Sequence, residues 1–157
     1  MQIMRIIEKH KKDPANLIHI LLDYQSFKEN NCITEDEVTI IADELGITKS
    51  RVYSIVTFYT LFSIKPRGNF IIQVCDDVPC YVNGSVNIIM ELEKLLGIKM
   101  GETTPDGVFT LEKTSCIGCC DRSPAFRVGE ELYGDLDSLK TAGIIAELRR
   151  KYNEHRE

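Results

Sequence analysis

Five of the six cysteines in this 157-residue chain lie in two short segments, and these are the residues best suited to chemistry. The first segment, which is expected to form a loop, holds Cys75 and Cys80 in a C-x4-C pair. The second holds Cys116, Cys119 and Cys120, which give a C-x2-C or a C-x3-C pair according to which of the last two thiols is used. Four thiolates that meet in space bind a metal ion or an iron–sulfur cluster. Free cysteines that only pack in a core would not gather in two segments.

The spacing leaves several kinds of site open. Structural zinc sites usually have about two residues between paired cysteines, because a tight knuckle turns the chain around one ion. The wider gap between Cys75 and Cys80 favours an iron–sulfur centre, in which each pair of thiolates holds one of two irons. Zinc, a disulfide or a redox dithiol stays open at this point. The C-x-x-C spacing typical of a redox dithiol occurs only between Cys116 and Cys119.

The stretches before the two cysteine segments are typical of β-strands. Residues 70–74 precede the first segment, and residues 108–113 precede the second. Two cysteine pairs at the ends of two strands of one small domain can meet in space. A helix is expected over residues 86–96. A hairpin and a last helix follow the second segment, so the predicted order after residue 69 is strand, helix, strand, strand, strand, helix.

The first part of the chain is expected to be helical. Asp13 and Pro14 start one helix, Thr34 opens another through a capping box with Glu37, and Thr48 caps the next. The last of these helices is expected to reach Phe62. Pro66 and Gly68 then mark a linker, which divides the chain into predicted domains of residues 1–66 and 67–157. Cys32 lies in this first part and is interpreted as a structural or incidental thiol.

Charge and hydropathy argue against several classes of protein. The net charge is −5, and residues 1–66 hold eight Lys and Arg against nine Asp and Glu, so the helix–Gly–helix pattern is not expected to bind nucleic acid. The hydrophobic content of 43% supports a core without a disulfide framework. Neither a signal core nor a run of ~20 apolar residues is found, so membrane insertion is not expected. Reduced thiols or a cluster suit a cytoplasmic location.

A resemblance to a known family adds to the spacing. The Cys75-x4-Cys80 pair, followed by Cys116-Ile117-Gly118-Cys119-Cys120-Asp121 and Pro124, resembles the thioredoxin-like [2Fe–2S] ferredoxin family. The segments 56–62, 101–107 and 109–112 resemble it too. The resemblance implies a mixed α+β or α/β fold, with a thioredoxin-like ferredoxin domain preceded by a small N-terminal helical bundle. It also implies four ligands for one [2Fe–2S] cluster: Cys75, Cys80, Cys116 and Cys120. Cys119 stands where the family usually has alanine.

The resemblance also implies a function. The family includes the small iron–sulfur subunit of respiratory complex I and matching subunits of NAD(P)-linked hydrogenases and formate dehydrogenases. An electron-transfer subunit is therefore expected, with a flavin-bearing NAD(P)H-oxidising partner and further iron–sulfur subunits. No catalytic centre is expected on this chain alone, since it has no Gly-rich dinucleotide fingerprint and its three histidines, His10, His19 and His155, are scattered. Asp76, Asp77 and Asp121 are expected to lower the cluster potential. The alternative is a zinc-stabilised interaction module.

Overall fold

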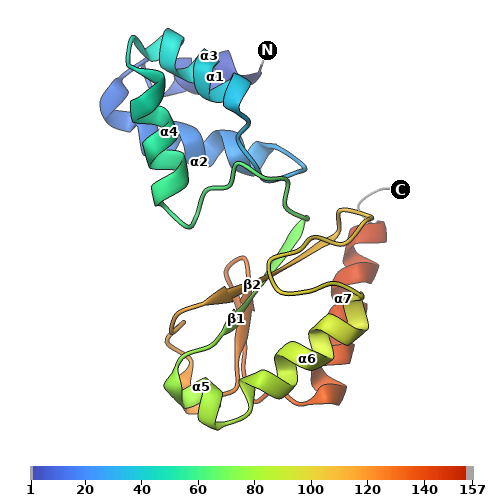
Figure 1. The fold of residues 1–157 in the computed structure, drawn as a ribbon. Helices are drawn as coiled ribbons and strands as arrows, with labels where there is room; N and C mark the ends of the chain where they lie inside the picture. The colour runs from blue at the N-terminus through green and yellow to red at the C-terminus, as the bar shows by residue number, and fades with distance from the viewer. Residues whose placement is uncertain (1, 155–157) are drawn as a thin grey trace. The chain divides into compact units, whose positions relative to one another are not determined.

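The computed structural model describes residues 2–154, which form two compact units (Figure 1). One unit ends at Arg67 and the other begins at Gly68. Met1 and residues 155–157, which include His155, lie outside the described residues. Within residues 2–154, no helix combines the length and the apolar character needed to cross a bilayer.

The first unit is helical and has its own core. Ile7, Ile20, Leu21, Ile41 and Val52 are fully buried within it. Cys32 is buried in this unit too, and burial raises the pKa of its thiol. The elements are α1 (Gln2–Lys9), the 3-10 turn η1 (Pro14–Asn16), α2 (Leu17–Phe27), α3 (Glu35–Leu45) and α4 (Lys49–Phe58).

The boundaries of these helices follow local chemistry, with one exception. Thr34 and Glu37 form the predicted capping box, and Gly46 ends α3 in the left-handed conformation at φ 63°. The prediction that the next helix reaches Phe62 was wrong, because α4 ends at Phe58. Buried Gln25 explains the early end. Its side chain donates to the Leu61 carbonyl at 2.8 Å and accepts from the Ser63 N–H at 3.0 Å, which satisfies both groups outside a helix.

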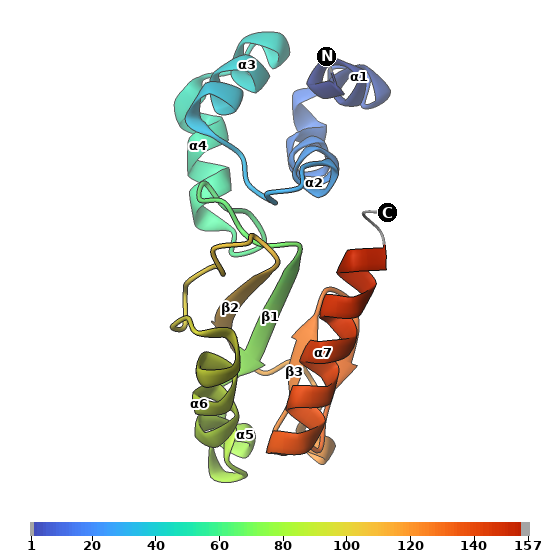
Figure 2. The ribbon, with the colours of Figure 1, turned by 90° about the vertical axis from the view of Figure 1, so that its right-hand side faces the viewer.

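The second unit contains a four-stranded sheet in the order β2-β1-β3-β4 (Figures 1 and 2). β1 pairs with β2 in parallel and with β3 antiparallel, and β3 pairs antiparallel with β4. This order of strands and helices confirms the predicted mixed fold. The strands are β1 (Phe70–Cys75), β2 (Phe109–Thr114), β3 (Phe126–Val128) and β4 (Glu131–Tyr133); the helices are α5 (Val78–Val82), α6 (Ser85–Leu96) and α7 (Ser138–Glu154), with a 3-10 turn η2 (Cys120–Arg122).

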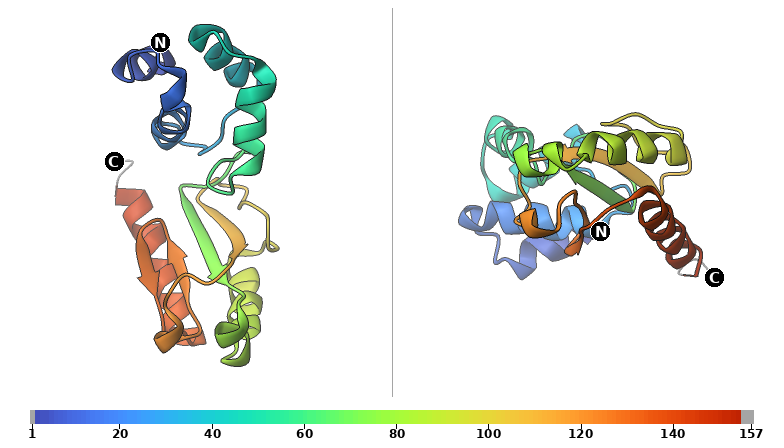
Figure 3. Two further views of the ribbon diagram at one scale, coloured as in Figure 1. Left: turned by 90° about the vertical axis from the view of Figure 1, so that its left-hand side faces the viewer. Right: turned by 90° about the horizontal axis from the view of Figure 1, so that it is seen from below.

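One face of the sheet forms the core of the second unit. Ile72 and Val74 point to the same face, since side chains alternate along a strand. Two of their register partners, Leu111 in β2 and Phe126 in β3, join them in the core. This apolar face packs with residues of α6 and α7 (Figures 2 and 3). By the same alternation, Cys75 lies on the opposite face, at the carboxyl end of β1.

Candidate metal centre

The parallel pairing of β1 and β2 brings the two cysteine segments to one edge of the sheet. Cys75 is the register partner of Thr114, so Cys116 follows two residues beyond the same end of the sheet. Cys80 lies on α5, which begins shortly after β1. The sequence predicted a loop there, and that prediction was wrong: Asp77 caps a short helix and Pro79 occupies its first turn.

The first pair of thiols is buried. Cys75 and Cys80 are each 1% exposed, and their thiols are hydrogen-bonded to each other. Ala125 holds both residues from β3's side: its carbonyl accepts from the Cys75 N–H at 3.1 Å, and its own N–H donates to the Cys80 thiol. The preceding Ser123–Pro124 bond is cis. Ala125 therefore holds Cys75 through its carbonyl and Cys80 through its N–H.

The second pair of thiols is exposed. The sulfurs of Cys116 and Cys120 lie 3.3 Å apart. The N–H of Gly118 donates to the Cys116 sulfur at 3.4 Å, and its φ of 78° suits glycine. The Cys120 thiol also interacts electrostatically with Cys75 and Cys80. All four predicted ligand residues therefore lie in one region.

Cys119 is placed differently from its neighbours. It is 7% exposed and packs in a small apolar cluster with Cys75, Cys80 and Ala125. Its sulfur lies next to Gly134, at 3.1 Å from the position that a Cβ on this glycine would take. The Cys119 side chain is therefore buried, whereas Cys116 and Cys120 are exposed and their sulfurs lie against each other.

The second cysteine segment is fastened to the chain after β4. Arg122 pairs with Asp135 at 3.0 Å between Nε and Oδ2, and the Asp135 N–H donates to the Arg122 carbonyl. Gly134 lies so close that a Cβ there would be 2.6 Å from the Arg122 Cβ. Sequence reasoning missed Arg122, Gly134 and Asp135, because these contacts join residues with no shared local motif.

Two of the four proposed ligand thiols, Cys80 and Cys120, have a raised pKa. Burial raises the pKa of Cys80 to about 11, and its hydrogen bond with Cys75 adds to this rise. The hydrogen bond with Cys116 raises the pKa of Cys120 above its ordinary value. Metal ligands are thiolates, so binding iron at this site must displace protons.

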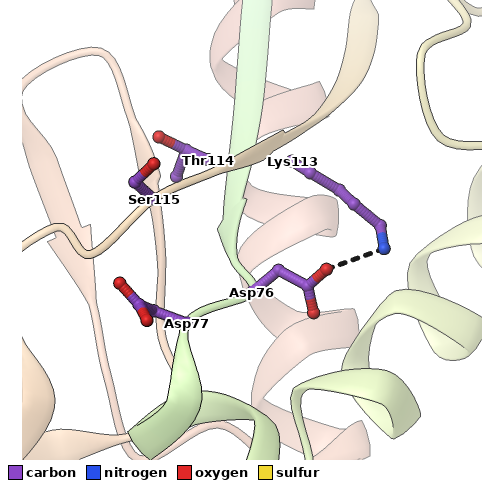
Figure 4. Close-up of a pocket in the computed structure, with 5 residues that line it drawn as sticks. All are labelled: Asp76, Asp77, Lys113, Thr114 and Ser115. Atoms are coloured by element: carbon purple, nitrogen blue, oxygen red, sulfur yellow. Dashed lines mark hydrogen bonds and ion pairs between the residues drawn. The ribbon is translucent and has the colours of Figure 1, made fainter.

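A small open pocket lies beside the cysteines, between the ends of β1 and β2 (Figure 4). It has a volume of about 430 Å³. Asp76 pairs with Lys113 across one side of it at 2.8 Å. Among residues 2–154, no three His, Cys, Asp or Glu side chains converge on a single point. The lining residues are Asp76, Asp77, Lys113, Thr114 and Ser115.

The donor set matches a centre with two metal ions. The thiols come as two pairs, each with one sulfur that accepts a backbone N–H, from Ala125 to Cys80 and from Gly118 to Cys116. A [2Fe–2S] cluster takes four thiolates, two on each iron, and hydrogen bonds to its sulfurs tune its potential. The residues therefore fit such a cluster.

Comparison with known proteins gives relatives along nearly the whole chain. The family model of thioredoxin-like [2Fe–2S] ferredoxins matches residues 3–149. An E-type subunit of the NADH-quinone oxidoreductase of Rhizobium meliloti is 39% identical over 122 residues, 78% of this chain and 73% of that protein. The E-type subunit of the NADH-quinone oxidoreductase of Rickettsia conorii is 36% identical over 148 residues, which cover 94% of this chain and 87% of that protein.

Solved structures show the same fold. An NAD+-reducing [NiFe]-hydrogenase in the air-oxidised state is similar with a TM-score of 0.75 over 87% of this chain, at 18% sequence identity. The matched region is 23% of that hydrogenase chain. The H2-reduced state of such a hydrogenase gives a TM-score of 0.74, again at 18% identity. At this identity the similarity concerns the fold.

Proposed function

The chain belongs to the thioredoxin-like [2Fe–2S] ferredoxin family, and from that premise we propose that Cys75, Cys80, Cys116 and Cys120 hold its one [2Fe–2S] cluster. The observation that carries this assignment is the sulfur pair of Cys116 and Cys120, 3.3 Å apart beside the buried pair. Cys119 faces Gly134 and is left out of the ligand set. Family membership also favours the cluster over the zinc-stabilised module.

The bound cluster supplies a centre that accepts and donates one electron at a time. The protein's part is to hold the thiolates and to set the electrostatics around them. The backbone N–H groups of Ala125 and Gly118 point at the proposed ligand sulfurs, and such hydrogen bonds raise the potential. Negative charge nearby lowers it. Lys113 offsets the charge of Asp76, so the predicted effect of this carboxylate is smaller than its position suggests.

We propose that the chain passes electrons to or from a flavin-bearing NAD(P)H-oxidising subunit and further iron–sulfur subunits. The names of its relatives, E-type subunits of NADH-quinone oxidoreductases, support an assembly of this type. An NAD+-reducing hydrogenase is the second parent complex to consider, since a hydrogenase chain shares the fold. In either assembly we place the chain on the cytoplasmic side, because thiolate ligands suit a reducing compartment. The electron carrier corresponds to the predicted domain 67–157.

The test compares two adjacent cysteines in the anaerobically purified full chain. Iron, sulfide and zinc are measured, and EPR spectra are recorded before and after dithionite. We expect about two irons and two sulfides per wild-type chain, with a signal only after reduction. The Cys119→Ala variant should keep this content and spectrum, whereas Cys120→Ala should lose the cluster. Stoichiometric zinc in an EPR-silent chain would refute the cluster, and loss in Cys119→Ala alone would refute the ligand assignment.

A further inference from the structure

One carboxylate touches both cysteine segments. The Oδ1 atom of Asp77 accepts from the Val78 N–H at 2.9 Å, at the start of α5. Its Oδ2 atom accepts from the Cys116 N–H at 3.2 Å, across 39 residues of sequence. Since α5 carries Cys80, a single side chain connects the helix of one proposed ligand to the backbone of another.

We propose that Asp77 is a positioning residue that holds the two ligand pairs at the separation the cluster needs. This inference rests on the proposed function. The last backbone link between the segments is the hydrogen bond from the Asp76 N–H to the Thr114 carbonyl, at 3.1 Å. Beyond it, Cys116 lies in a stretch without regular structure, so its backbone depends on side chains for its place.

The bridge that the Asp77 side chain forms between Val78 and Cys116 needs a carboxylate. The two hydrogen-bond partners of the Asp77 side chain, Val78 and Cys116, both donate an N–H. A carboxylate offers each of them an acceptor oxygen. An asparagine has one acceptor oxygen, and its amide NH2 would face the second donor. A serine can cap α5, but its hydroxyl is too short to reach Cys116 as well. Conservative substitutions therefore remove one bond at a time.

Asp76 provides a matched control at the next position. Its carboxylate points toward Lys113, while that of Asp77 points away from this lysine (Figure 4). Replacing either aspartate by asparagine removes one negative charge beside the proposed ligand Cys75. Only the change at Asp77 removes one of the two hydrogen bonds by which this side chain links α5 to the second cysteine segment. A difference between the two variants therefore reports on the bridge and not on charge.

The experiment measures iron release to a chelator from the loaded full chain, and hydrogen exchange of peptides that contain Val78 or Cys116, with and without the cluster. We expect Asp77→Asn to release iron about tenfold faster than wild type, as the loss of one charge-assisted hydrogen bond implies. Asp76→Asn should release it at the wild-type rate. Asp77→Ser should lose protection at Cys116 while keeping it at Val78.

Equal rates in the Asp76→Asn and Asp77→Asn variants would overturn the inference, and so would unchanged exchange at Cys116 in Asp77→Ser. A wild-type chain that binds no cluster would instead refute the proposed function. Exchange at Cys116 in the cluster-free chain would still test the bridge, so the two failures are distinguishable. If Asp77→Asn does not fold, the Asp77→Ser variant gives the same reading through hydrogen exchange.

Discussion

Replacing Gly134 by alanine should damage the second cysteine segment through steric overlap alone. A Cβ on this residue would lie 2.6 Å from the Arg122 Cβ, 2.7 Å from the Arg122 carbonyl oxygen and 3.1 Å from the Cys119 sulfur. The first two atoms belong to the backbone or its immediate neighbour, so they cannot swing away as the end of a long side chain could. Relief requires the segment that carries Cys116 and Cys120 to move.

Overpacking of this kind costs about 1–3 kcal/mol of unfolding free energy. A loss of about 2 kcal/mol would lower the melting temperature of a unit this size by about 10 °C. The assay is thermal unfolding of the cluster-free chain by circular dichroism, together with the iron content of the loaded chain. Gly143→Ala is the control, because this glycine is exposed on α7 and no atom outside its own stretch of the helix lies within 4 Å of the added Cβ. It should stabilise the helix by about 0.5–1 kcal/mol. If the Gly134→Ala variant had the melting temperature and iron content of the wild type, the close approach of Gly134 to Arg122 would be refuted.

Three further predictions concern a buried side chain, a helix cap and the loss of stability at acid pH. Leu92→Ala should lower the unfolding free energy by about 2–5 kcal/mol in urea titrations, because this fully buried side chain of α6 leaves a cavity. Thr34→Ala should cost the helical unit about 1 kcal/mol, and Thr34→Ser should restore it. Hydrogen bonding to Thr104 lowers the pKa of Asp106 from 3.8 to about 2, so its stabilising effect is complete above pH 3.8 and is lost as the pH falls toward 2. NMR titration checks this pKa, and Asp106→Asn should remove that part of the pH dependence.

Local chemistry explains why much of the site was predictable. The strands before both cysteine segments have patterns that fix their ends, and parallel pairing of β1 with β2 then brings those ends together. Even the element that was missed left a local signal. Asp77 followed by Val78 and Pro79 is an N-cap with proline in the first turn, which predicts the short helix α5 where a loop was expected.

Contacts between distant residues explain the rest. Nothing near Gln25 in sequence shows that its amide will satisfy Leu61 and Ser63 and so end α4 early. Likewise, Gly134 is followed by a left-handed Asp135 with no motif that points to Arg122. Such positions depend on the folded chain as a whole, so a pattern read along the sequence does not find them.

The parallel pairing of β1 with β2 also has a consequence for biosynthesis. Parallel neighbours need a crossover, so Cys116 leaves the ribosome 41 residues after Cys75. At ~5–20 residues per second, the first pair of thiols waits about 2–8 s on the nascent chain before the second pair is made. The sheet must then form across this long loop before all four sulfurs meet. An assembled cluster can therefore be transferred to all four cysteines only after Cys120 has been translated and β1 has paired with β2.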